Sequence, residues 1–251
     1  MNKTYTKQGD VNFSKFLFEK FGAIKSSGIV PVYLPVLIAA LTARMLLFLN
    51  WMESPFRYYH MITGLDMKTI MGAVEQFCHG QTDFSIYKFF VYCCYLAYGQ
   101  ELSVPAIIFG QLALGVLTSL LITFTTFKIL KNRAAALISG MFAALYSPEL
   151  MHECVILIDT VYVFTCVLSL AAIVQQSRRP ASKSWLLLSG IAAALPSLVR
   201  FPGVLWTFLA IAWIIYTRLR RERRGSHKIS AGVAALLPVT GLLIAFLPVS
   251  I

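Results

Sequence analysis

Apolar runs long enough to cross a membrane recur from residue 29 to residue 251 of this chain, separated by short polar stretches. A helix rises 1.5 Å per residue, so about 20 apolar residues cover the ~30 Å hydrocarbon core of a bilayer. Only 13% of the residues are charged, whereas soluble domains carry about a quarter. The pattern predicts an all-α, polytopic transmembrane helix bundle and excludes a soluble globular domain.

The transmembrane domain is expected over 29–251, with about seven spans. Five runs are expected to cross: 29–50, 104–127, 134–146, 155–174 and 229–251. The second and third are expected to form a tight hairpin at the basic cluster 128–133, and Pro148 is expected to break the third. Two shorter segments flank the sequence PSLVRFPG, where Pro196 and Pro202 predict an interrupted helix. Residues 51–102 mix aromatic and charged groups with short apolar patches, which predicts a structured outer loop with interfacial helices.

The basic residues predict the orientation of the chain in the membrane. Most of the 22 Lys and Arg residues lie in four stretches: 1–28, 128–133, 178–183 and 218–228. Cytoplasmic loops are enriched in Lys and Arg, so these stretches are expected in the cytoplasm, with 1–28 as a tail. We therefore expect a multi-pass protein of the cell membrane, either a bacterial inner membrane or an equivalent internal membrane. The net charge of +11 is explained by this topology and does not indicate a nucleic-acid partner.

The first outer loop contains Asp66, just after Gly64 and at the start of an amphipathic stretch. A carboxylate beside the membrane can act as general base for an acceptor hydroxyl of a lipid-linked substrate. Asp is also a common helix N-cap, and the sequence leaves both roles open.

The second outer segment, SPELMHECVILID, holds Glu149, Glu153 and Asp159. Because Asp159 lies inside apolar sequence, we expect it to face a cavity or a charged partner. Arg200 lies in the interrupted helix, where it can bind an anionic head group or pair with Asp159. A transporter using Asp159 and Arg200 as a midplane pair is therefore one alternative function.

Several chemistries are not indicated. The outer histidines His60, His79 and His152 lack the spacing of a zinc protease, and no metal site is predicted. Nucleotide-binding glycine patterns and a serine-hydrolase elbow are missing, and the sequence does not identify a cofactor.

The segments GLDM, SPELMHE followed by LID, and LVRFPG, in this order and with basic turns between them, resemble the dolichyl-phosphate-mannose protein mannosyltransferases. These are polytopic membrane glycosyltransferases with lipid-phosphate sugar donors. The resemblance implies a hexosyltransferase that moves a sugar from a polyprenyl phosphate to an acceptor on the outer face. Its partners would be the lipid-linked sugar and membrane lipid. By resemblance, Asp66 and Glu153 are catalytic, and Asp159, Arg200 and Lys88 bind substrate.

The resemblance covers the amino-terminal half of such proteins, which also have further spans and often an outer soluble region. It implies a truncated form with a missing carboxy-terminal half. A second alternative function is thus a non-catalytic membrane assembly subunit.

Overall fold

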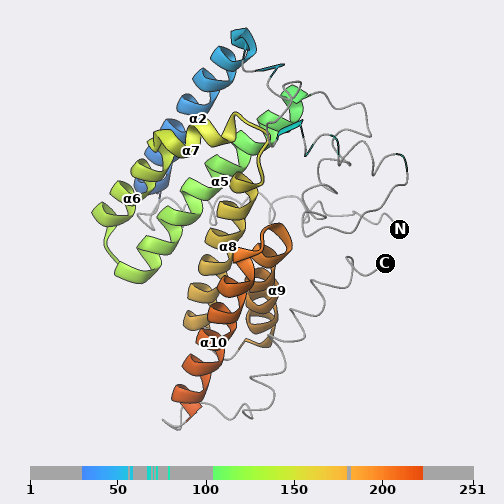
Figure 1. Ribbon diagram of the computed structural model, residues 1–251. Helices are drawn as coiled ribbons and strands as arrows, with labels where there is room; N and C mark the ends of the chain where they lie inside the picture. The colour runs from blue at the N-terminus through green and yellow to red at the C-terminus, as the bar shows by residue number, and fades with distance from the viewer. Residues whose placement is uncertain are drawn as a thin grey trace, which may run out of the picture.

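The structure is a computed structural model that describes residues 30–55, 57–58, 67–68, 70, 72, 79, 104–179 and 182–222. Its helices are α2 (Val30–Glu53), α5 (Val104–Leu130), α6 (Arg133–Leu145), α7 (Ser147–Glu153), α8 (Ile158–Arg178), α9 (Lys183–Val199) and α10 (Pro202–Glu222). No strand occurs among the described residues. The predicted all-α class is confirmed (Figure 1).

Six of the described helices form two groups of three. In the first group, α2, α5 and α6 pack around Val36, Ala40, Val116 and Ala144. In the second, α8, α9 and α10 pack around a core that includes Ile173, Leu186 and Ile214. Contact between α5 and α8 joins the two groups, as Figure 1 shows near the centre of the molecule.

Three described helices, α2, α5 and α8, are long and apolar enough to cross a membrane. The number is four if α6 and α7, which are bent by 48° at their junction, count as one broken span. The α9 and α10 helices are shorter apolar helices, and the expected span 229–251 lies outside the described residues. Several membrane-spanning helices are therefore present, and the count of about seven stays a prediction.

The expected tight hairpin after the second span is confirmed between α5 and α6. Lys131, directly after α5, has a left-handed conformation with φ 53°, and its N–H donates to the Phe127 carbonyl at 2.9 Å. The Asn132 side chain then caps α6 by accepting from the Ala135 N–H at 3.1 Å. Two residues thus reverse the chain at a basic turn.

The expected break at Pro148 is also present, as a short helix and not as a loop. The α6 helix ends at Leu145, and Pro148 lies in the first turn of α7. That position suits proline because the first N–H groups of a helix have no partner within the helix. Residues 154–157, between α7 and α8, are not helical.

The interruption expected within PSLVRFPG is present, but Pro196 itself does not break the helix. The α9 helix continues through Pro196 to Val199, and the chain breaks at Arg200 and Phe201 before Pro202 opens α10. A proline removes one backbone hydrogen bond but need not end a membrane helix that neighbouring helices enclose, and Pro196 is buried. As a result, α9 and α10 form an antiparallel hairpin with Arg200 at its turn.

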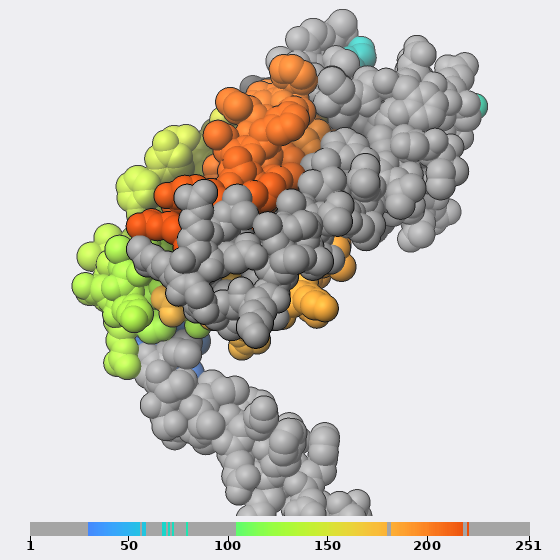
Figure 2. All heavy atoms as spheres, turned by 90° about the horizontal axis from the view of Figure 1, so that it is seen from below, coloured from blue at the N-terminus to red at the C-terminus, as the bar shows by residue number. Residues whose placement is uncertain are grey.

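The outer face of α10 is apolar and exposed along its length. Phe201, just before the helix, and Leu205, Phe208, Leu209 and Trp213 within it all have more than half of their surface exposed. Figure 2 shows this helix, in orange, on the surface of the molecule. Such a surface is suited to lipid, as the membrane assignment requires.

Candidate functional site

A hydrophobic cluster lies at the helix ends farthest from the basic turns. We call it the end cluster; its buried members are Trp51, Met67, Ile70, Ile107, Ile108, Leu112, Cys154, Ile156, Ile158 and Val199. They come from the end of α2, the start of α5, the segment that leads into the first residue of α8, the last residue of α9 and the segment between α2 and α5. The cluster therefore fixes five parts of the chain to one another.

The end cluster contains direct chain neighbours of four predicted site residues. Met67 follows Asp66, Cys154 follows Glu153, Ile158 precedes Asp159, and Val199 precedes Arg200. Asp66 and Lys88 themselves lie outside the described residues. The backbone next to each of the other predicted residues, and next to Asp66, therefore converges on the same end of the bundle.

Asp159 and Arg200 form an ion pair, which we call the half-exposed pair. Asp159 lies in the first turn of α8 and Arg200 follows α9, and Arg200 Nη1 donates to Asp159 Oδ1. Their side chains are 35% and 42% exposed. A guanidinium has five N–H donors in a planar fork that suits carboxylates and phosphates, so Arg200 has the chemistry to bind an anionic head group from the exposed side.

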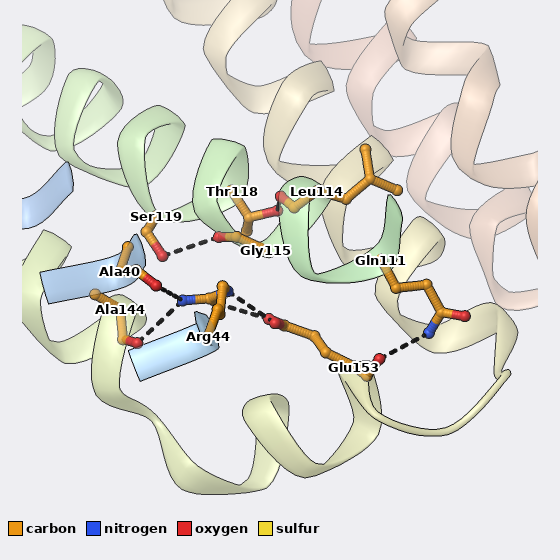
Figure 3. A network of polar contacts seen from close by, with 9 residues as sticks. All are labelled: Ala40, Arg44, Gln111, Leu114, Gly115, Thr118, Ser119, Ala144 and Glu153. Carbon is orange, nitrogen blue, oxygen red and sulfur yellow. Dashed lines mark hydrogen bonds and ion pairs between the residues drawn. The ribbon is translucent and has the colours of Figure 1, made fainter. Parts of the chain in front are cut away.

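A second ion pair, which we call the buried pair, joins Arg44 and Glu153. Arg44 Nε donates to Glu153 Oε2 at 2.8 Å, and Nη2 donates to Oε1 at 2.6 Å. The third nitrogen, Nη1, donates to the carbonyls of Ala144 at 3.1 Å and Ala40 at 3.5 Å. Figure 3 shows that the guanidinium points into the space between α2, α6 and the end of α7. Arg44 is 3% exposed and Glu153 0%.

The α5 helix completes the surroundings of the buried pair. Gly115 faces the Glu153 carboxylate so closely that an added Cβ would overlap it. Gln111, one turn earlier, donates from Nε2 to the Val155 carbonyl at 2.8 Å and to the Glu153 carbonyl at 3.4 Å. The backbone after Glu153 is therefore attached to α5 as well.

The two ion pairs answer questions that the sequence left open. Asp159 and Arg200 pair with each other, which was one of the two arrangements expected for each residue. The structure buries Glu153, which was expected in an outer segment, and pairs it with Arg44. No partner for Arg44 could be assigned from the sequence, and nothing in the sequence pointed to Gly115 or Gln111. The available clue was that a charge inside a span needs a partner, and Arg44 is the charge of the first span.

The depth of the half-exposed pair bears on the transporter alternative. A transporter of that kind requires Asp159 and Arg200 near the middle of the membrane. Both residues instead lie at helix ends, and α8, with 21 residues, is about 30 Å long at 1.5 Å per residue. Because α8 is a candidate span, its first turn is expected near one boundary of the hydrocarbon core, which disfavours a midplane site.

Apolar helices with charged groups at one end define the class as a multi-pass membrane protein. The model of one family, described as dolichyl-phosphate-mannose-protein mannosyltransferase, matches residues 97–249, more than half of the chain. The chain belongs to this family of membrane glycosyltransferases. Searches of curated proteins and of solved structures found no match. The matched range includes Glu153, Asp159 and Arg200, whereas Arg44, Asp66 and Lys88 precede it.

Proposed function

We propose that the chain transfers a hexose from a polyprenyl-phosphate donor to an acceptor hydroxyl on the outer face of the membrane. The observation that carries the proposal is the end cluster, because segments carrying Asp66, Asp159 and Arg200 meet there. The basic turns lie at the opposite ends of the helices and support a cytoplasmic amino terminus with the site outside.

In the proposed reaction, the acceptor oxygen forms a bond to the anomeric carbon of the sugar while the bond from that carbon to the phosphate oxygen breaks. Asp66 takes the proton of the acceptor hydroxyl, and the polyprenyl phosphate leaves with the bonding electron pair. Arg200 and Lys88 bind the phosphate and stabilise its growing charge. Asp159 holds the Arg200 guanidinium at the site.

The half-exposed pair supports the role of Arg200 as a phosphate ligand. A cation that binds a charged substrate must be reachable, and the side chain of Arg200 is 42% exposed. A lipid-linked donor arrives from within the bilayer with its phosphate at the membrane boundary, which is also the level of the start of α8. The apolar flank of α10 lies next to this turn.

The test is transfer of radiolabelled mannose from dolichyl phosphate or a bacterial polyprenyl phosphate in membranes that contain this chain. We expect transfer with the parent chain and loss of transfer in Asp66→Asn at matched amounts of protein. Asp10→Asn, in the predicted cytoplasmic tail, is the matched control and is expected to be fully active. No transfer from any donor by folded parent protein would contradict the proposal and favour an assembly subunit.

A further inference from the structure

The segment 154–157 is not helical, yet it leads into Asp159. The N–H groups of Cys154 and Val155 donate to the Met151 and His152 carbonyls at the end of α7, at 3.2 and 3.3 Å, and side chains hold the rest of the segment. Two of its residues, Cys154 and Ile156, are buried in the end cluster, and its Val155 carbonyl accepts from Gln111. The residue immediately before the segment, Glu153, is held by its hydrogen bonds to Arg44.

The buried pair connects Glu153, at the end of α7, to three other helices. Arg44 belongs to α2 and contacts the last turn of α6 through the Ala144 carbonyl, while Gly115 of α5 lies against the carboxylate. Gly115 is about 16 Å along α5 from its start at 1.5 Å per residue, a depth at which water is scarce. Both carboxylate oxygens of Glu153 accept hydrogen bonds from Arg44 there. The charged carboxylate is therefore stabilised in this one position.

The Glu153 carboxylate can occupy this position only because residue 115 has no side chain. A Cβ at residue 115 would overlap the carboxylate of Glu153, which the Arg44 fork prevents from moving aside without breaking both hydrogen bonds. Gly110 lies on the same helix, and a Cβ there would meet nothing within 4 Å. The two glycines therefore form a matched pair of substitution sites.

We infer that Arg44 and Gly115 are positioning residues for the transfer reaction, which hold Glu153 and thereby fix segment 154–157 and the Asp159–Arg200 pair that follows it. The inference rests on the proposed function for the role of Arg200. It gives Glu153 a positioning role in place of the catalytic one that the resemblance implied, because a carboxylate that is 0% exposed with both oxygens bonded to Arg44 does not reach an acceptor.

The first test compares Gly115→Ala with Gly110→Ala at equal amounts of folded protein. We expect Gly115→Ala to raise the KM for the polyprenyl-phosphate donor about 10- to 100-fold, because misplacement of a binding group by about 1 Å has effects of this order. Gly110→Ala should leave KM and kcat unchanged. A purely structural role would lower the amount of folded protein without changing its KM. Equal KM values for the two variants would overturn the inference.

The second test separates positioning from catalysis by Glu153. Glu153→Leu leaves Arg44 buried and unpaired, whereas the double variant Arg44→Met with Glu153→Leu removes both charges. If Glu153 only positions, the double variant should transfer sugar at least about tenfold faster than Glu153→Leu, because no charge is left buried without a partner. If Glu153 takes the proton, the double variant will be as inactive as the single one, and the inference is wrong.

The third test does not depend on activity. Cys154 is free and buried, directly after Glu153, so its thiol reports on the segment. The other four cysteines are replaced by serine for this measurement: Cys78, Cys93, Cys94 and Cys166. With N-ethylmaleimide, we expect slow labelling in this background and in Gly110→Ala. Labelling should be about tenfold faster in Gly115→Ala and Arg44→Met, because local opening exposes the thiol.

Arg44→Lys keeps the charge but loses the two-nitrogen contact, and it replaces Arg44→Met if that variant does not accumulate. Its labelling rate should fall between those of the background and Gly115→Ala. Slow labelling in every variant would overturn the inference even if transfer is observed. Fast labelling in a chain that transfers no sugar would reject the proposed function alone and leave the positioning of the segment supported.

Discussion

The buried pair and the half-exposed pair have the same chemical groups and very different surroundings. In the buried pair, Arg44 and Glu153 are 3% and 0% exposed, two nitrogens meet two oxygens, and backbone carbonyls bind the third nitrogen. In the half-exposed pair, Arg200 and Asp159 are 42% and 35% exposed, and Arg200 Nη1 donates to Asp159 Oδ1. One arrangement holds helices together, and the other leaves a cation within reach of a ligand.

The physical reason is the solvent around each pair. Inside the bundle, an unpaired charge has no water to solvate it, so each partner of the buried pair requires the other. At the membrane boundary, water screens the attraction and the pair contributes little to stability. Arg200 can therefore exchange a carboxylate for a phosphate at low cost, whereas Arg44 cannot leave Glu153.

Removal of one partner from each pair is the strongest test of this comparison. We expect Arg44→Met to lower the free energy of unfolding by about 3 to 5 kcal/mol, because it leaves Glu153 buried without a partner. Arg200→Met should cost about 0 to 1 kcal/mol. Thermal unfolding of the detergent-solubilised protein, followed by size-exclusion chromatography, measures both. Equal losses in Tm would show that burial does not distinguish the pairs.

A substitution at Gly203, in the first turn of α10 after Arg200, tests how the half-exposed pair is held. A Cβ on Gly203 would overlap the carbonyl of Pro196, which is backbone and cannot turn aside. We expect Gly203→Ala to lower stability by about 2 kcal/mol and to raise the donor KM, because the turn that carries Arg200 must shift. Gly110→Ala, in open space, is the control. A Gly203→Ala chain with the Tm and KM of the parent would mean that this turn does not position Arg200.

Substitutions of Arg200 itself should affect binding more than folding. Arg200→Gln is expected to raise the donor KM about 10- to 100-fold, because a charge-assisted contact to phosphate is lost. Arg200→Lys should recover part of the affinity, since it restores the charge without the planar fork. Arg179→Gln, at the opposite end of α8, is the control and should bind donor normally. A KM that is unchanged in Arg200→Gln would remove this residue from the site.

The smallest effect is expected within the second helix group. Trp206 of α10 donates from Nε1 to the Ser169 hydroxyl of α8 at 3.1 Å. Trp206→Phe should lower stability by about 0.6 kcal/mol, the usual size of a polar contact between membrane helices. Donor KM should not change. Ser169→Ala combined with Trp206→Phe should be no less stable than Trp206→Phe alone, and an additive loss would show that the two groups do not interact.

Much of the helical framework could be predicted from the sequence. The runs 29–50, 104–127 and 134–146 correspond to α2, α5 and α6 with ends that differ by few residues. The break near Pro148 and the reversal at the basic turn after α5 were also expected. Each of these features depends on local composition, either on apolar length or on residues that end helices.

The site was predictable only in part. Asp159 and Arg200 stood out because charges inside apolar sequence are costly. The sequence predicted the interruption within PSLVRFPG but not its exact position at Arg200, because the effect of Pro196 depends on the helices packed around it. The partner of Arg44 lies 109 positions away, and nothing local distinguishes Glu153 from Glu149 as that partner.

The sequence by itself therefore determined the membrane class, the helices and the side of the bundle that carries the acidic groups, because hydrophobic length and charge asymmetry act residue by residue. Only the tertiary structure decided which acid pairs with which arginine. That choice depends on where α2, α5 and α7 meet and on the missing Cβ of Gly115, which leaves room for one carboxylate. Close packing at a depth without water makes this arrangement specific, and no single segment of the chain encodes it.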